Sequence, residues 1–274
     1  MELEEELRRK IAQIQPLDER AMALAKKRWD SIAHPLHSLG LLEDAIVTIA
    51  GAQGSHQVEL NKRCVTPFCA DNGVVAQGVT QSEQDVTTIV TKNFCSGEAS
   101  VCVMARVAGA DVIPVDIGVA QDVTEPGLRV HKIAYGTADI TQGPAMTREQ
   151  AADAILYGMN LVKELKEEGY RLIATGEMGI GNTTTSSALL SVLLHRPVEE
   201  MTGRGAGLSS EGLKRKIDAI HRAIEVNQPD PDDPLDTLHK VGGLDIAGLV
   251  GVFLGGAHYH LPILIDGLIS GAAA

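Results

Sequence analysis

The segment LIATGEMGIGNTTTSSALLSVLLH, residues 172–195, carries the pattern that decides the fold. Its β-branched start at 172–175 predicts a short buried strand, and its Ala- and Leu-rich end at 183–195 predicts a helix. Three glycines, Gly176, Gly179 and Gly181, lie in the turn between the two. A strand that passes through a Gly-rich turn into a helix is typical of a βαβ unit, so the segment indicates a parallel sheet.

The same alternation of short strands and longer helices recurs from about residue 65 onward. Strands are predicted at 64–70, 111–117, 172–175 and 262–265, and helices at 87–108, 148–169, 183–195, 209–227 and 244–259. The sequence therefore predicts an α/β fold in which helices flank a parallel sheet. The Pro- and Asp-rich segment 228–234 is typical of a connecting loop.

The N-terminal region differs from the rest of the chain. Leu3, Leu7, Ile11 and Ile14 recur at helical spacing among charged residues until Pro16 interrupts the pattern. Two short surface helices are expected here, as a small helical appendage. We expect residues 1–60 to form a helical small-domain segment and residues 61–274 to form the α/β core.

Composition excludes several classes of protein. Hydrophobic residues make up 44% and charged residues 22% of the 274 residues, as in ordinary globular proteins. The 24 Lys and Arg face 36 Asp and Glu, and the net charge of −12 disfavours nucleic acid and anionic membranes as partners. Because the N-terminus is highly charged and apolar runs are interrupted, we expect neither a secretion signal nor a membrane span, and a cytoplasmic location.

Cysteine and histidine spacing disfavours metal and acyl-transfer chemistry. Cys64, Cys69, Cys95 and Cys102 lie in apolar stretches without CxxC spacing, so buried thiols are expected. The close histidine pairs at 34/37 and 258/260 lack a neighbouring carboxylate or thiolate at ligand spacing. No GxSxG elbow occurs. We expect no metal and no cofactor.

The turn after the third predicted strand indicates an anion site. Free N–H groups at a helix N-terminus bind phosphate, and here hydroxyl residues 183–187 follow the glycines. The spacing from Gly176 to Gly181 matches a Walker loop, but Asn182 replaces its lysine. The dinucleotide fingerprint also fails, because its third glycine is missing. A single phosphate therefore fits better than a triphosphate, and a capped structural helix stays the alternative.

Further polar residues follow other predicted strands or open other helices. Asp71 and Asp116 end the first two strands, and Asp266 with Gly267 follows the last. Gly203, Arg204 and Gly205 begin a second Gly-rich loop, which supplies backbone donors and a guanidinium before a helix that Ser209 can cap. Lys216 lies on that helix opposite its apolar face, where spacing alone favours a solvated lysine.

Taken together, these loops resemble the nicotinate-nucleotide:dimethylbenzimidazole phosphoribosyltransferases of cobalamin nucleotide-loop assembly. The resemblance covers nearly the whole chain, and the GEMGIGNTT string is its most specific part. The matching segments are 35–43, 71–79, 115–118, 176–184, 203–207, Lys216, 242–247 and 265–267.

The resemblance implies that residues 61–274 form a Rossmann-like nucleotide- and base-binding core, with a smaller helical domain, and that the protein is a homodimer. It implies that 5,6-dimethylbenzimidazole, or a related base, displaces nicotinate from nicotinate mononucleotide, giving α-ribazole 5′-phosphate. The positions that match Glu177 and Lys216 lie in the family's active site, and those that match Ser82 and Met178 face its base pocket.

These residues suit such a reaction. Backbone and side-chain donors of the two Gly-rich loops can hold the single 5′-phosphate, and Lys216 can neutralise its charge. The donors expected there belong to Gly179, Gly181, Asn182, Thr183, Gly203, Arg204 and Gly205. Carboxylates stabilise an oxocarbenium-like ribose, and Glu177, Asp245 and Asp266, the last beside Gly267, are the candidates.

Two departures from the family pattern leave alternatives open. Leu36 and His37 stand where the family has Pro-Gly. Similar proteins continue past residues 265–267 to a Gly-Glu-Gly motif whose Glu is taken as the general base, whereas this chain stops at Ala274. Glu177 is then the resident substitute. The alternatives are a catalytically impaired nucleotide-binding subunit, or a truncated form, that needs the carboxylate from a partner or extension, and a nucleotide-dependent kinase or ATPase.

Overall fold

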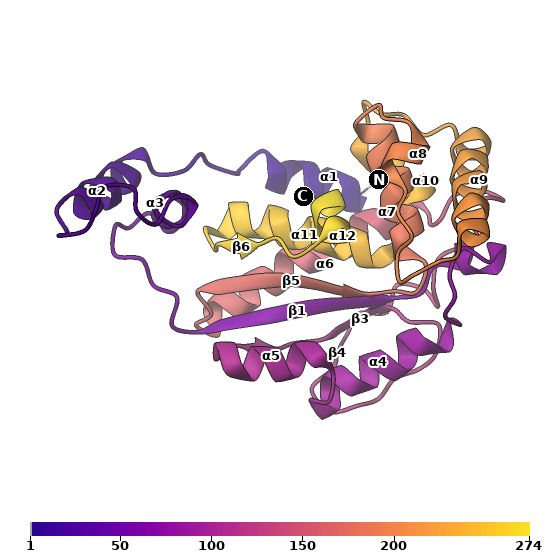
Figure 1. Cartoon of the computed structure of the whole chain (residues 1–274), viewed down its shortest axis with the longest axis horizontal. Coiled ribbons are helices and arrows are strands. Elements are labelled where there is room, and N and C mark those ends of the chain that lie inside the picture. The colour runs from indigo at the N-terminus through magenta and orange to yellow at the C-terminus, as the bar shows by residue number, and fades with distance from the viewer. Residues whose placement is uncertain (1) are drawn as a thin grey trace.

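The computed structural model describes residues 2–274 and has a six-stranded parallel sheet at its centre (Figure 1). The strands are β1 Arg63–Ala70, β2 Asp111–Val112, β3 Val115–Gly118, β4 Arg129–Val130, β5 Leu172–Met178 and β6 Ile263–Leu264. Their order is β4-β3-β1-β5-β6, and β2 pairs with β1 on the side of β3. The predicted α/β class with a Rossmann-like parallel sheet is confirmed.

Helices cover both faces of this sheet. They are α1 Glu2–Ile11, α2 Glu19–Asp30, α3 Leu41–Gln53, α4 Asp85–Ser96, α5 Ser100–Ala108, α6 Arg148–Glu167, α7 Asn182–Leu193, α8 Val198–Met201, α9 Ser210–Asn227, α10 Pro234–Val241, α11 Leu244–Tyr259 and α12 Leu268–Ala273, with a 3-10 turn η1 Gly73–Gln77. Figure 1 shows α4 and α5 on one face and α6 and α11 on the other.

Glycines allow α6 and α11 to pack closely in the core. A Cβ added at Gly158 of α6 would overlap the carbonyl oxygen of Gly248, and one at Gly251 of α11 would overlap that of Ile155. A Cβ at Gly248 would overlap the ring of Phe68 in β1. Backbone contact of this kind holds α11 against both α6 and the sheet, so the N-terminus of α11 is carried to the carboxyl ends of the strands.

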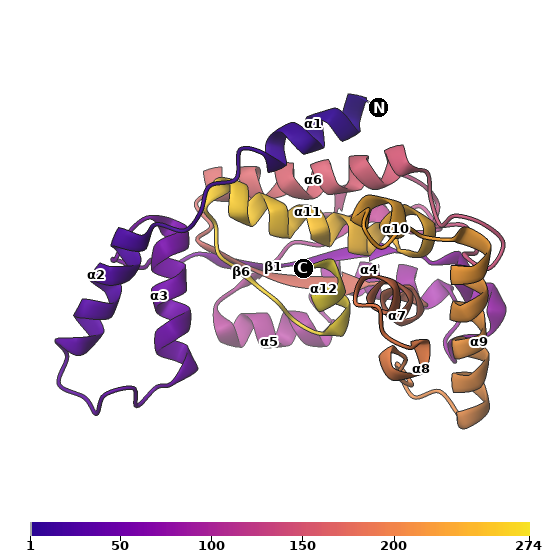
Figure 2. The same ribbon diagram turned by 90° about the horizontal axis from the view of Figure 1, so that it is seen from above.

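The N-terminal helices divide between the core and an arm. α1 lies along α6, and its Leu7 belongs to the main core. α2 and α3 form an antiparallel pair that stands away from the body, beyond the amino ends of the strands and opposite α9 (Figure 2). The two short helices expected on either side of Pro16 are therefore present.

Several predicted boundaries are wrong, each for a local reason. The single helix expected at 87–108 is two helices, because Gly97, at φ 78°, ends α4 in the left-handed conformation. The strand expected at 111–117 is interrupted at Pro114, which has no N–H for the ladder. The connecting loop predicted at 228–234 ends at Asp233, because α10 begins at Pro234 and the Asp233 carboxylate accepts from the N–H groups of residues 235 and 236.

Replacing Gly251 with alanine should reduce the free energy of unfolding by about 1 to 3 kcal/mol, because the added methyl forces α11 away from α6. Chemical denaturation measures this change. Gly271→Ala is the matched control: its Cβ meets open space in α12, so stability should rise by up to about 1 kcal/mol. Equal effects of the two substitutions would contradict the packing argument.

Candidate functional site

Parallel pairing gathers the polar strand ends at one edge of the sheet. β5 continues past its predicted end through Glu177 and Met178, which pair in register with Phe68 and Cys69 of β1. The Asp71-Asn72 corner after β1 therefore lies beside the turn that follows β5. In open α/β sheets ligands bind at this edge, so the candidate site is located here.

The turn at 179–181 depends on its glycines. A Cβ at Gly179 would overlap the carbonyl oxygen of Ala70 and lie 2.7 Å from Asp245 Oδ2. Gly181 adopts φ 95° immediately before α7, a conformation that favours glycine. The Ile180 N–H donates to Thr87 Oγ1 at 3.1 Å. These contacts bring the N-terminus of α7, with its free N–H groups, to the end of β1.

Two carboxylates and one amide meet at the start of α7. The side-chain amide of Asn182 donates to Glu177 and, at 2.9 Å, to Asp245 Oδ2. Asp245, in the first turn of α11, is fully buried, and burial raises its pKa to about 6. Burial, together with the charge of Asp245, raises the pKa of Glu177 to about 7. Both groups therefore titrate near neutral pH.

Lys216 lies on the other side of the α7 start. It is 1% exposed, and its Nζ donates to Thr183 Oγ1 at 2.8 Å and to the Gly203 carbonyl at 3.3 Å. Burial lowers the pKa of Lys216 to about 8. Within residues 2–274 it forms no salt bridge with a carboxylate. The solvated position that spacing alone favours is wrong, and a buried cation beside free N–H groups suits an anionic ligand.

The second Gly-rich loop lies against the same lysine. A Cβ on Gly205 would be 3.0 Å from Thr183 Oγ1 and 3.6 Å from Lys216 Nζ. The Arg204 guanidinium is turned toward α9, where it donates to the Leu208 carbonyl at 2.8 Å and to Ser210 Oγ at 3.0 Å. Arg204 thus closes its own loop, and contact between this side chain and substrate stays a prediction.

Of the two residues predicted to face a base, Met178 lies against an apolar cluster, and Ser82 lies in the loop before α4. Met178 packs against a small cluster that includes Phe94, Cys102 and Val119. Ser82 is half-buried, and its segment is attached to the 203–207 loop because the amide of Gln81 donates to the Ala206 carbonyl at 2.6 Å. Met178 therefore lies at the end of β5 beside the candidate site, and a position of Ser82 against a base stays a prediction.

Asp266 and Gly267 form an exposed turn after β6. The backbone N–H of Asp266 donates to Thr175 Oγ1 at 3.2 Å, which ties this turn to β5. The charge of Asp266 is one of the groups that raise the pKa of Glu177. Asp266 therefore faces Glu177 from the solvent side, whereas Asp245 does so from the protein interior.

Three further residues belong to this edge but are not among the predicted site residues. Asp71 and Asn72 are both fully buried, and Thr87 anchors the 179–181 turn. The Asp71 carboxylate accepts from the Ala120 N–H at 2.7 Å. Asp71 and Asn72 could have been predicted as site residues, because they directly follow the first predicted strand. Thr87 carries no such signal, because its role depends on packing between α4 and the turn.

The other residue types singled out in the sequence do not join this site as ligands. The predicted burial of Cys64, Cys69 and Cys102 is confirmed, and Cys95 is half-buried. Burial raises the pKa of the Cys64 thiol to about 12. Within residues 2–274, no group of three or more His, Cys, Asp or Glu side chains is placed to hold a metal ion. None of the helices in this range is both long and apolar enough to span a membrane.

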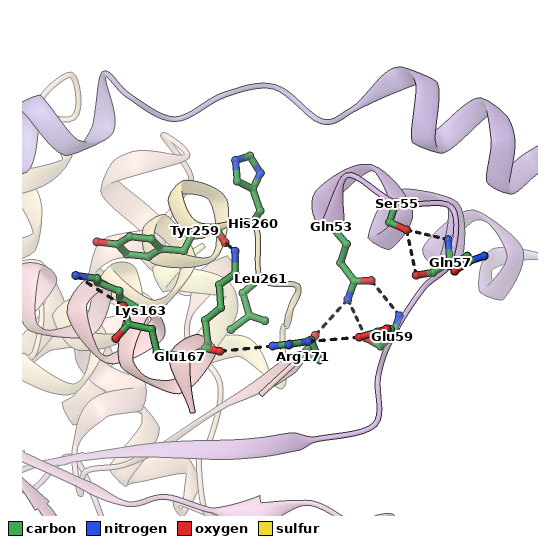
Figure 3. A pocket seen from close by; sticks show the side chains of 11 residues that line it. Gln53, Ser55, Gln57, Glu59, Lys163, Glu167, Arg171, Tyr259, His260 and Leu261 are labelled. Atoms are coloured by element: carbon green, nitrogen blue, oxygen red, sulfur yellow. Dashed lines mark hydrogen bonds and ion pairs between the residues drawn. The ribbon is translucent and has the colours of Figure 1, made fainter. Parts of the chain in front are cut away.

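A hollow of about 560 Å³ lies at the opposite edge of the sheet, next to the arm (Figure 3). Several of its polar groups already have partners. Arg171 pairs with Glu59 at 3.6 Å, and the Gln53 amide donates to the Glu59 carbonyl at 2.8 Å. Because Arg171 precedes β5, this hollow faces the amino ends of the strands, where ligands of open α/β sheets do not collect.

A parallel sheet with a Gly-rich helix start, a buried lysine and buried carboxylates at one edge is typical of α/β enzymes that act on phosphorylated small molecules. The chain belongs to the family of the model described as Phosphoribosyltransferase, which matches residues 14–274. The predicted family membership and transferase class are confirmed.

Several curated relatives carry the name nicotinate-nucleotide–dimethylbenzimidazole phosphoribosyltransferase. The Acetivibrio thermocellus protein is 49% identical over 92% of this chain and 72% of its own length. The Ruminiclostridium cellulolyticum protein is 48% identical over 96% of this chain and 75% of its own. A crystal structure of CobT from Thermus thermophilus matches with a TM-score of 0.88 and 38% identity, over 93% of this chain and 76% of that one. The chain thus spans about three quarters of the length of these relatives.

Proposed function

We propose that this chain transfers the ribose 5-phosphate of nicotinate mononucleotide to 5,6-dimethylbenzimidazole or a related base, as a step of cobalamin biosynthesis. The products are α-ribazole 5′-phosphate and nicotinate. The observation that carries the proposal is the buried Lys216 beside the Gly-rich start of α7, which pairs with no carboxylate of residues 2–274, in a chain whose relatives carry the name of this activity.

The phosphate end of the substrate binds between α7 and α9. At the positive end of α7, the backbone N–H groups of Gly181 and Thr183 can donate to the phosphate, whereas those of Ile180 and Asn182 already donate to Thr87 Oγ1 and to the Gly179 carbonyl. Lys216 supplies the charge, and the Thr183 hydroxyl, which accepts from Lys216, is free to donate to a phosphate oxygen. The backbone of Gly203 and Gly205 closes this pocket from the second loop.

The ribose lies toward the carboxylates. When the bond from C1′ to nicotinate breaks, nicotinate leaves with the electron pair and the ribose becomes oxocarbenium-like. The negative charges of Asp245 and Glu177 stabilise this cation from the sheet side. Asp266 adds a further negative charge from the solvent side.

The incoming base needs a proton acceptor. One ring nitrogen of the benzimidazole attacks C1′, and the other nitrogen then loses its proton. Glu177, with a pKa of about 7, is half ionised at neutral pH and can take this proton. Met178 and its apolar neighbours provide the surface against which the flat base packs. Glu177 is therefore the general base of the proposed reaction.

The proposed reaction is tested by following nicotinate release from nicotinate mononucleotide with and without 5,6-dimethylbenzimidazole. We expect release that depends on the base, together with formation of α-ribazole 5′-phosphate in equal amount. The two products are separated and quantified by chromatography. Hydrolysis of the mononucleotide at the same rate in the absence of base would contradict the transfer, and ATP-dependent chemistry would favour a kinase instead.

Replacing Lys216 with methionine removes the charge but keeps the length of the side chain. We expect binding of nicotinate mononucleotide to weaken at least tenfold, because a charge-assisted hydrogen bond to phosphate is lost. In the unsubstituted protein, affinity should fall as pH rises through about 8, where Lys216 loses its proton. Isothermal titration calorimetry between pH 6.5 and 9 checks both expectations.

The control for Lys216→Met is the exposed Lys163→Met on α6, which should leave affinity and its pH dependence unchanged. An unchanged dissociation constant in Lys216→Met would place the phosphate elsewhere. If Lys216→Met binds weakly but the unsubstituted protein keeps its affinity at pH 9, then the site is correct and the titrating group is not Lys216.

We also propose that the chain forms a homodimer, with residues 1–60 as a helical small-domain segment beside the 61–274 core. Large apolar side chains are exposed both in the arm and on α5, and such patches mark interaction surfaces. In the arm they include Leu36 and Leu41, which are 72% and 84% exposed. On α5 they include Met104 and Val107, which are 71% and 88% exposed.

Sedimentation velocity tests this assembly. We expect the unsubstituted chain to sediment as a dimer at micromolar concentration, and Leu41→Asp or Val107→Asp to shift the population toward monomer. Val226→Asp is the control, since Val226 is 49% exposed on α9 and lies outside both patches. A monomeric unsubstituted chain, or equal dissociation by all three substitutions, would contradict the proposed use of these patches.

A further inference from the structure

The side-chain amide of Asn182 lies between two carboxylates that come from different elements. It donates to Glu177 at the end of β5 and to Asp245 in the first turn of α11. A primary amide nitrogen carries two hydrogens, so both are used by these acceptors. The Asn182 side chain therefore joins α7, β5 and α11 and has no hydrogen left for a phosphate.

Asp245 is confined on both sides by backbone. A Cβ at Gly243 would lie 2.5 Å from its Oδ1, and one at Gly179 would lie 2.7 Å from its Oδ2. Among residues 2–274, Oδ1 has no hydrogen-bond partner. Asp245 is 0% exposed, so it cannot turn toward solvent to reach another donor. Asn182 is the one side chain that donates to it in this range.

A neutral donor between two carboxylates acts differently from a cation. Lysine or arginine at position 182 would neutralise both groups and hold them ionised. The Asn182 amide holds Glu177 and Asp245 in place, but it leaves their mutual repulsion uncompensated. The negative charge of Asp245 therefore acts on Glu177 at short range in a buried site.

We propose that Asn182 and Asp245 are positioning residues for Glu177. Asp245 supplies a buried negative charge that makes Glu177 a stronger proton acceptor, and Asn182 holds the Glu177 carboxylate beside the phosphate pocket. The inference rests on the proposed function, in which Glu177 takes the proton of the incoming base. Neither Asn182 nor Asp245 needs to exchange a proton with substrate in this arrangement.

Other charged groups around this pair act more weakly on Glu177. Asp266 faces Glu177 from an exposed turn, where water screens its charge. Asp71, at the end of β1, acts on Asp245, and the nearby Asp116 is paired with Lys132 at 3.0 Å. Lys216, from α9, is directed at Thr183 and Gly203 rather than at a carboxylate. Asp245 is therefore the charge whose removal should change Glu177 most.

The two positioning residues are expected to shift the titration of Glu177 in opposite directions. Asp245→Asn removes the repulsion, so the pKa of Glu177 should fall by about 1 unit. Asn182→Leu removes the donor that favours the carboxylate form, so the pKa of Glu177 should rise. The rate of base-dependent nicotinate release is measured against pH. The acid limb of this profile should move to lower pH in Asp245→Asn and to higher pH in Asn182→Leu.

The pKa of Glu177 can also be measured by a method that does not depend on enzymatic activity. Glutamate labelled with ¹³C at its side-chain carboxyl is followed by NMR from pH 4 to 9, with the Glu177 signal assigned as the one lost in Glu177→Gln. This titration separates two failures. An inactive chain with the expected opposite shifts overturns the proposed reaction alone. An active chain in which Asp245→Asn moves the Glu177 titration by less than about 0.3 units overturns the positioning role alone.

A purely structural role for Asn182 is tested with a matched asparagine. Asn227 is also buried, and its amide donates to the Ile140 and Ala223 carbonyls at 2.7 and 2.8 Å. Asn227→Leu should lower the melting temperature without moving the Glu177 titration. If Asn182→Leu does not fold, Asn182→Ser, which keeps one short donor, should raise the pKa of Glu177 by less. A Glu177 titration that is unmoved in both folded Asn182→Ser and Asp245→Asn overturns the proposal.

Discussion

The approach of the 179–181 turn to the end of β1 is the contact on which the other features of the site depend. Gly179 lies so close to the Ala70 carbonyl that no side chain fits between them. This contact places the first residues of α7 at the carboxyl edge of the sheet. Asn182 then reaches the two carboxylates, and Thr183, the next residue, reaches Lys216. A larger residue at 179 would disturb the arrangement of all five side chains at once.

The carboxyl edge of the sheet differs from the rest of this acidic protein because its carboxylates are buried. The chain has a net charge of −12, yet it places Glu177, Asp245 and Asp71 together where like charges repel. Burying carboxylates without countercharges reduces stability. The close packing of α6 on α11 and of α11 on the sheet holds Asp245 there nevertheless. Buried carboxylates that repel one another and have shifted pKa values are typical of a functional site rather than of a structural ion pair.

Much of the fold follows from local patterns, and part of the site does not. Alternating strand and helix periods predict the parallel sheet, α11 at its observed bounds, and the Gly-rich start of α7. Periodicity alone does not predict an interruption that a single residue causes, such as the end of α4 at Gly97 or the gap between β2 and β3 at Pro114. Lys216 shows the limit most clearly. Its helical spacing is that of a solvated lysine, but the start of α7 and the loop at Gly203, both distant in sequence, pack over it and bury it. Thr87 is missed for the same reason.

Asparagine rather than lysine at position 182 suits a reaction with a single phosphate and a cationic ribose. In a Walker loop, lysine at this position would face the phosphates and would also neutralise nearby carboxylates. Here the positive charge comes instead from α9, through Lys216, on the Thr183 side of α7. The carboxylates remain free to titrate on the Asn182 side. In the proposed reaction, adjacent residues of one helix therefore separate the charge proposed to bind phosphate from the charge proposed to stabilise the ribose.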